Sequence, residues 1–223
     1  MKRLVFTILV IAILLVLAVV SPWQNIKFSL ENLLGNKVPV TSSSLEVSSL
    51  GGKLVVNIDG TEVGKTNVDE SKLEISPIDA GTKRVIIKRD SDTTYYVLDR
   101  QISFEKGVSS VISWESGPNY SSSSGWILTP TKKNVVSTNN DVVLSFVTSK
   151  GDELYIDDVK TSESNITIDP TKTYKISVKR DGYLPLSFQL FGFDTDKANQ
   201  VKSYDFVIET KLAEIPLKVN EVN

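Results

Sequence analysis

The chain has 223 residues, of which 40% are hydrophobic and 23% charged, enough for one large domain or two small ones. It contains no cysteine and no histidine, which excludes disulfides, cysteine-ligated zinc, iron–sulfur clusters, histidine-ligated haem and the Ser-His-Asp and Cys-His catalytic groups. With 25 basic and 27 acidic residues the net charge is −2, which is not the composition of a nucleic-acid-binding protein.

The first predicted element is an apolar segment near the N-terminus. Residues 4–20 (LVFTILVIAILLVLAVV) follow Lys2 and Arg3, and as a helix they would extend about 25 Å, close to the thickness of a hydrocarbon core. The segment is longer than a typical signal-peptide core and lacks a clear A-x-A cleavage pattern, which favours an uncleaved anchor over a cleaved leader. Because positive residues stay in the cytoplasm, we predict that residues 1–24 form a cytoplasmic tip and a transmembrane signal anchor. The rest of this single-pass protein would then lie at the cell surface or in the periplasm.

Residues 25–44 are predicted to be a juxtamembrane spacer. Apolar residues recur at helical spacing in its first part, at Ile26, Leu30, Leu33 and Leu34. This pattern indicates a short helix, or a continuation of the anchor, lying against the membrane or the first domain. Residues 38–44 (VPVTSSS) indicate an extended linker.

From residue 45 onward the pattern is that of β-strands, with turn residues every eight to twelve positions. Alternation of apolar and polar residues is clearest over 174–179 and 184–190. Shorter β-rich segments lie at 54–58, 84–88, 95–98, 110–114, 142–147, 154–156, 165–168 and 204–209, and a further one begins at Trp126. This spacing is typical of a small sandwich or barrel, so the region is predicted to be all-β.

The two halves of this region repeat each other. Residues 47–60 (VSSLGGKLVVNIDG) correspond to residues 147–158 (VTSKGDELYIDD), and Arg89 corresponds to Arg180. We therefore predict two tandem small β-sandwich domains with one N-terminal transmembrane helix. The predicted bounds are 45–115 and 126–215 for the domains, 116–125 for a Ser/Gly linker or loop, and 216–223 for a C-terminal tail.

Short motifs accompany the repeats. The first copy carries Ile58-Asp59-Gly60 and then Val63-Gly64-Lys65-Thr66, and the second carries Ile156-Asp157-Asp158 and then Lys179-Arg180-Asp181-Gly182-Tyr183. At these residues the chain resembles the PEGA domain, a small β-sandwich module of prokaryotic surface and membrane proteins. The tetrapeptide that names the family is absent from both copies, and Ser91-Asp92 stands where the first copy would have Gly-Tyr. The resemblance implies a fold and an envelope setting, since the family shares no catalytic activity.

The conspicuous acids and glycines are predicted to serve turns rather than chemistry. Asp59-Gly60 is a strong type I′ hairpin signal, because both central residues of that turn need positive φ, and Asp157-Asp158 is the same turn with a poorer second residue. The predicted turn residues are Asp59, Gly60, Gly64, Asp90, Gly151, Asp157, Asp158, Asp181, Gly182 and Tyr183. The remaining acidic groups lack the spacing of a calcium loop, so no metal, cofactor or catalytic residue is predicted.

Two aromatic residues bracket a run of four serines. Tyr120 and Trp126 are candidate glycan contacts, because aromatic rings on a loop can stack on sugars. Packing in a core is the favoured alternative for Trp126, as it is for Trp114.

The predicted function is that of a non-catalytic envelope spacer or binding module for a protein or a glycan. A tandem arrangement supplies reach and two binding units, and exposed strand edges can accept a partner strand. One alternative is a carboxylate-dependent hydrolase of envelope glycan, the enzyme class that this composition leaves most open. Another is a secreted binding protein, if the leader is cleaved.

Overall fold

The computed structural model describes residues 42–49, 51–67, 71–134 and 141–216. Within these residues the chain forms fifteen strands in three sheets and one short helix, which confirms the all-β prediction. No helix of the described part is long and apolar enough to cross a bilayer. The predicted span at residues 4–20 and most of the spacer lie outside the described residues.

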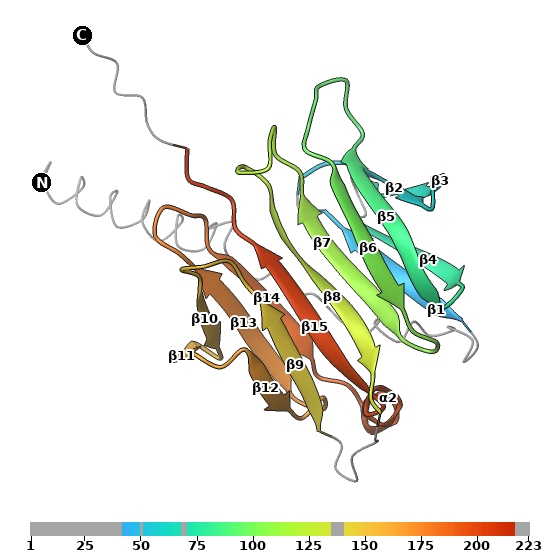
Figure 1. Cartoon of the computed structure of the whole chain (residues 1–223), viewed down its shortest axis with the longest axis vertical. Coiled ribbons are helices and arrows are strands. Elements are labelled where there is room, and N and C mark those ends of the chain that lie inside the picture. The colour runs from blue at the N-terminus through green and yellow to red at the C-terminus, as the bar shows by residue number, and fades with distance from the viewer. Residues whose placement is uncertain (1–41, 50, 68–70, 135–140, 217–223) are drawn as a thin grey trace, which may run out of the picture.

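The strands fall into two sets of seven with one strand between them (Figure 1). The first set is β1 (Ser43–Ser48), β2 (Leu54–Ile58), β3 (Thr61–Lys65), β4 (Lys72–Ile78), β5 (Gly81–Arg89), β6 (Leu98–Phe104) and β7 (Ser109–Glu115). The strand between them is β8 (Ser124–Lys132). The second set is β9 (Val142–Val147), β10 (Glu153–Ile156), β11 (Val159–Thr161), β12 (Asn165–Ile168), β13 (Thr173–Lys179), β14 (Leu186–Phe191) and β15 (Tyr204–Lys211), with α2 (Thr195–Val201) before β15.

The two sets have the same topology. Each has a four-stranded sheet, in the order β3-β2-β5-β6 for the first set and β11-β10-β13-β14 for the second. The remaining strands of both sets join β8 in one seven-stranded sheet, in the order β12-β9-β15-β8-β7-β1-β4. Because β8 is antiparallel to both β7 and β15, these two equivalent strands run in the same direction on either side of it. The repeats are therefore related by an approximate twofold axis along β8.

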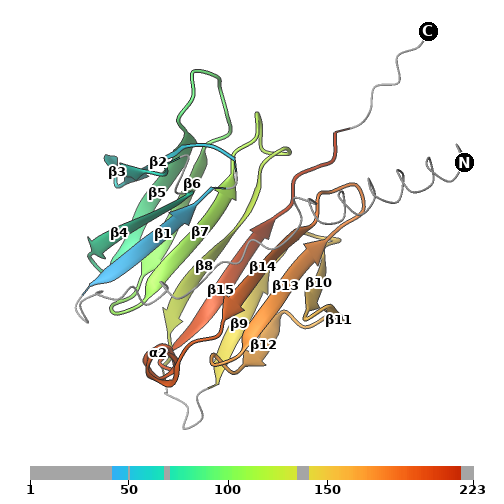
Figure 2. The same ribbon diagram turned by 180° about the vertical axis from the view of Figure 1, so that it is seen from behind.

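Alternation along the shared strands places the two four-stranded sheets on opposite faces of the seven-stranded sheet (Figures 1 and 2). On β8, Trp126 and Leu128 pack into the core of the second repeat, whereas Ile127 packs into the core of the first. On β7 the same division separates Val111 from Ile112. Each repeat thus has its own core, and both cores use β7 and β8.

The serine-rich segment is a hairpin connection within the seven-stranded sheet. Glu115 pairs with Ser124 and Ser113 with Trp126, so residues 116–123 form the loop between β7 and β8. Of the two interpretations, linker or loop, the loop is therefore the one observed. Gly125 lies inside β8, where a Cβ would come within 2.2 Å of the carbonyl oxygen of Ser113, so only glycine allows this close pairing.

Several boundaries differ from the sequence prediction. β1 begins at Ser43, inside the segment predicted as spacer, and β6 begins at Leu98, so the strand predicted at 95–98 is wrong. Residues 95–97 form a loop instead, because Tyr96 donates its backbone N–H to the carbonyl oxygen of Gly117 and packs its ring near Trp114. The strands predicted at 142–147 and 165–168 have the observed bounds.

Candidate functional site

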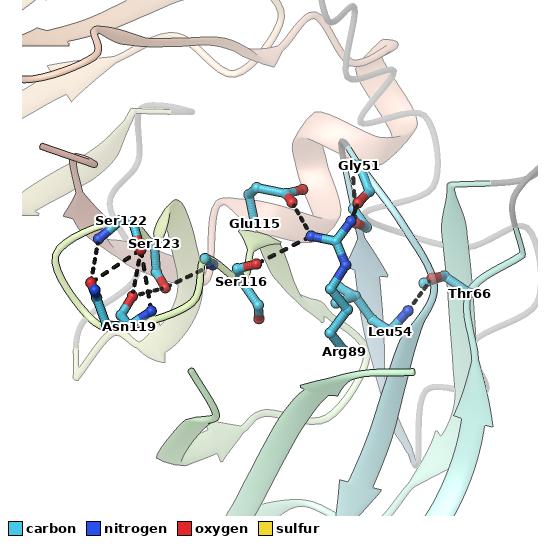
Figure 3. Close-up of polar contacts among 11 residues, drawn as sticks. Gly51, Leu54, Thr66, Arg89, Glu115, Ser116, Asn119, Ser122 and Ser123 are labelled. Carbon is cyan, nitrogen blue, oxygen red and sulfur yellow. Dashed lines mark hydrogen bonds and ion pairs between the residues drawn. The ribbon is translucent and has the colours of Figure 1, made fainter. Parts of the chain in front are cut away.

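Arg89 forms a polar cluster of the first repeat, at the end of β5 (Figure 3). Its Nη1 donates to Oε1 of Glu115 at 3.0 Å and to the carbonyl oxygen of Ser116 at 3.3 Å, and its Nη2 donates to the carbonyl oxygen of Gly51. Gly52 leaves room for the guanidinium, since a Cβ at this position would lie 2.7 Å from Nη2 and the residue has a φ of +135°. Arg89 thus joins the β1–β2 turn to the end of β7.

The electrostatics of this cluster are those of a structural ion pair. Burial raises the pKa of Glu115, and the charge of Arg89 opposes this shift only in part. Both side chains are about three-quarters buried. The guanidinium also lies 4.6 Å from the centre of the Tyr95 ring.

Arg180 occupies the equivalent position in the second repeat, immediately after β13. Its Nη1 donates to the carbonyl oxygen of Lys150 at 3.1 Å, and its Nε lies 3.3 Å from Oδ1 of Asp152, a buried carboxylate. The guanidinium stacks on Tyr183 at 3.6 Å from the ring centre. Both arginines therefore bind the carbonyl of the turn that precedes the second strand of their repeat, which explains why the arginine recurs.

An open depression of about 400 Å³ lies beside Arg180. Its lining residues are Gly151, Glu153, Lys179, Arg180, Asp181, Tyr183 and Pro185. Hydrogen bonds from Lys160 and Tyr155 lower the pKa of Glu153. A glycosidase general acid needs a raised pKa, so Glu153 has the opposite adjustment.

Asp59 and Asp157 lie in equivalent hairpin turns. Asp59 has a φ of +49° and is followed by Gly60 at +85°, whereas Asp157 at +49° is followed by Asp158 at +66°. The carboxylate of Asp59 accepts from the backbone N–H of Arg84 at 2.9 Å, and Asp157 accepts from that of Lys175 at 2.8 Å. The Arg84 N–H lowers the pKa of Asp59.

The other predicted turn residues also lie at backbone corners or close approaches. Gly151 and Gly182 have φ values of +89° and +79°. A Cβ on Gly64 would lie 3.0 Å from Leu73 Cδ2. Asp90 lies 3.4 Å from Lys65 Nζ, and Tyr183 forms an isolated bridge with Glu214. Asp181 lines the depression.

The two candidate glycan contacts have opposite environments. Trp126 is only 2% exposed and stacks on Phe188 with ring centres 4.5 Å apart, so its indole belongs to the core and cannot meet a sugar. Tyr120 is 49% exposed at the tip of the β7–β8 loop. Its ring lies edge-on to Tyr96 at 5.2 Å, with Lys211 Nζ 4.5 Å from its centre.

The serine loop that carries Tyr120 is held by its own side chains (Figure 3). Asn119 Oδ1 accepts from the backbone N–H of Ser122 at 3.0 Å, and the hydroxyl of Ser123 donates to the carbonyl oxygen of Asn119 at 2.8 Å and accepts from the N–H of Gly117 at 3.0 Å. Lys211 reaches the carbonyl oxygen of Ser123 at 3.5 Å, and burial lowers the pKa of this lysine. Tyr120 is thus presented by an ordered loop.

No group of three or more acidic residues that could hold a metal occurs in the described residues. Three acids of the second repeat have partners within the fold: Asp152 pairs with Arg180, Glu153 pairs with Lys160, and Asp194 caps α2 by accepting from the N–H of Lys197.

Sequence reasoning missed two features. The strand predicted at 95–98 includes Tyr96, although this residue packs against Tyr120, and no sequence pattern links the two residues across 24 positions. Glu46 is 1% exposed and pairs with Lys72 at 2.8 Å, but a lone acid between Leu45 and Val47 is expected to point away from the core and carries no signal of burial. No protein-family model matches the sequence, and no curated protein matches it significantly.

Proposed function

We propose that this chain is a membrane-anchored, PEGA-like protein of the cell envelope that acts outside the cytoplasm as a non-catalytic spacer or binding module. Its anchor would be residues 4–20, and its partner an envelope protein or a glycan. The observation that carries the proposal is the shared seven-stranded sheet, which makes two repeats into one continuous body. A continuous sheet suits a spacer, because it holds the loops at its ends at a fixed separation.

The polar residues that recur in both repeats have hydrogen-bond partners within the fold, which supports a role without catalysis. Arg89 and Arg180 bind turn carbonyls, and Asp59 and Asp157 bind backbone N–H groups. Such residues are conspicuous in the sequence because they shape the fold. Of the two candidate ligand contacts, Tyr120 remains accessible, and its exposed ring and ordered loop suit a sugar or a protein surface.

The anchor and the orientation are tested by fractionation of the full chain carrying a C-terminal tag. We expect the tag in the membrane fraction, released by detergent and accessible to protease from outside the cytoplasm. Recovery of a shortened soluble form would contradict the anchor and favour the secreted alternative.

The binding role is tested by photocrosslinking in intact cells. A photoreactive amino acid at Tyr120 is expected to capture an envelope protein or glycan, whereas the same group at Val159, exposed on strand β11, serves as a matched control. Capture at neither position, or at both equally, would remove the support for Tyr120. Glycan hydrolysis abolished by Glu153→Gln or Asp181→Asn would instead establish the hydrolase alternative.

A further inference from the structure

Within the described residues the seven-stranded sheet has two edge strands, and their residues differ in kind. One edge strand is β4, which carries Lys72, Glu74 and Pro77, and the other is β12, which has neither a charged residue nor a proline. Charges and proline at an edge discourage pairing with a strand of another molecule. Because β4 and β12 are equivalent strands of the two repeats, the first repeat protects its edge by side chains that the second repeat lacks.

The β12 edge carries a sequence motif for the attachment of a glycan. Asn165-Ile166-Thr167 has the form Asn-x-Ser/Thr, the acceptor for N-linked glycans in secreted proteins. Ile166 packs against the second core, so alternation places Asn165 and Thr167 together on the other face of the strand, where both are exposed. In the described part of the chain, no hydrogen bond to another residue involves the side chain of Asn165. Its carboxamide is therefore accessible and is not used by the fold.

A second motif of the same form has a different environment. It is formed by residues 119–121 (NYS) in the β7–β8 loop, where Oδ1 of Asn119 accepts from the N–H of Ser122 at 3.0 Å and from its hydroxyl at 3.1 Å. The carbonyl oxygen of Ser121 accepts from the N–H of Glu214 at 2.8 Å, which holds this motif in its turn. The structure thus distinguishes two similar motifs, because the carboxamide of the second closes a loop and that of the β12 motif does not.

We propose that Asn165 carries an N-linked glycan, which covers the free edge of β12. In the attachment reaction, Nδ2 of Asn165 forms a bond with the anomeric carbon of a lipid-linked sugar diphosphate, and the bond from that carbon to the diphosphate oxygen breaks. The diphosphate leaves with the bonding electrons, and the amide nitrogen loses one proton. A bulky, hydrated group beside β12 then gives this edge the protection that charges and proline give to β4.

This inference rests on the proposed location outside the cytoplasm, because the motif is an acceptor in secreted chains. The first test is mass spectrometry of the full chain from its own cells, after fractionation has established its location. Trypsin releases Asn165 in the peptide 161–172 and Asn119 in the peptide 107–132, so the two motifs are measured separately. We expect sugar mass on peptide 161–172 and none on peptide 107–132. An exported chain with unmodified Asn165 would overturn this inference alone, whereas a chain retained in the cytoplasm would contradict the proposed function as well.

Variants of the motif test whether Asn165 is the attachment site. Asn165→Gln and Thr167→Val remove the motif with little change in side-chain size, and each should abolish the added mass. Thr167→Ser keeps the motif and should retain the added mass. Asn119→Gln is the matched control and should also retain it. A glycan that survives Thr167→Val would overturn the assignment.

The effect of the glycan on the edge is tested by the association state of the exported protein in detergent. Asn165→Gln leaves the β12 edge uncovered, so in analytical ultracentrifugation we expect its mass to be at least about twice that of the glycosylated protein. Asn165→Lys also lacks the glycan but places a charge at the edge, as on β4, and should restore the lower mass. An Asn165→Gln protein that associates no more than the glycosylated protein would overturn the protective role of the glycan.

Discussion

Nη1 of Arg89 lies 3.0 Å from Oε1 of Glu115, which joins the last residue of β5 to the last residue of β7. These strands belong to different sheets, so the ion pair crosses from one layer of the first repeat to the other. The same guanidinium reaches the β1–β2 turn through Gly51. One side chain therefore fixes the relative position of three backbone segments.

Replacing Arg89 should be costly for stability. Arg89→Ala leaves Glu115, which is about three-quarters buried, without its cation and the carbonyl oxygens of Gly51 and Ser116 without this donor, so we expect a loss of about 2–3 kcal/mol in the free energy of unfolding. The measurement is urea unfolding followed by tryptophan fluorescence. Arg100→Ala is the control, because Arg100 is exposed and 4.0 Å from Glu209, and its loss should stay below about 0.5 kcal/mol. Equal effects would show that the Arg89 cluster contributes no special stability.

Substitutions at equivalent positions of the two hairpin turns should change the stability of the protein in opposite directions. Asp158 has a φ of +66° where the first repeat has Gly60, so Asp158→Gly should stabilise by about 0.5 kcal/mol despite loss of the exposed pair with Lys175. Gly60→Asp imposes a side chain at a φ of +85° and should destabilise by about 1 kcal/mol. Thermal unfolding of both variants checks the signs. A destabilised Asp158→Gly protein would mean that the ion pair outweighs the backbone strain.

The shared strands predict that both repeats unfold together. Trp126→Ala opens a cavity in the second core and Ile127→Ala opens one in the first, with expected losses of about 3–5 and 2–4 kcal/mol. Because both residues lie on β8, each variant should lower the midpoint of one common transition in calorimetry. Two transitions, of which each variant moves only one, would show that the repeats are independent.

The burial of Glu46 should make the stability of the protein depend on pH. Burial raises the pKa of this carboxyl above its ordinary value of 4.5, and Lys72 opposes the shift only in part. The folded state therefore keeps the proton at pH values where the unfolded state has lost it, so stability is lost as the pH rises from 4.5 through the folded pKa. Glu46→Gln removes this loss.

We expect Glu46→Gln to be more stable than the native protein at neutral pH and the difference to vanish below pH 4.5, measured by urea unfolding across that range. Glu62→Gln, an exposed carboxylate on β3, is the control and should follow the native curve. A Glu46→Gln protein that is less stable at neutral pH would indicate that the ion pair with Lys72 outweighs the cost of burial.

Much of the fold follows from local pattern, and the remainder depends on pairing between distant strands. Alternation defines β9 and β12, because each has one face in a core and one in a more polar environment. Trp126, Ile127 and Leu128 form an unbroken apolar run, which is what a strand buried on both faces requires. Such a run does not say which sheets it joins, and the continuity of the seven-stranded sheet is therefore not visible in the sequence.

The candidate site likewise combines residues that a local pattern predicts with contacts that depend on the folded chain. Asp59 and Gly60 predict their turn, because both central residues of a type I′ turn need positive φ and these residue types can adopt it. Arg89 stands out because Arg180 recurs after an equivalent strand, but its bond to Gly51 across 38 positions is a property of the folded chain. The β-rich run that begins at Trp126 favours core packing for this residue, and its burial against Phe188 of β14 confirms that prediction. The contact of Tyr120 with Tyr96 has no such local signal.

The axis along β8 has a consequence for how the molecule meets a partner. A rotation about an axis parallel to the strands preserves their direction, so the Arg89 and Arg180 turns emerge at the same end, on opposite sides of the seven-stranded sheet. A surface approached end-on meets both copies simultaneously, whereas a molecule arriving against one face meets a single copy. The number of copies that a partner contacts therefore depends on the direction from which it approaches. A layered polymer at the end of the molecule would contact the turns of both copies, whereas an isolated ligand at one face would contact the turn of one copy.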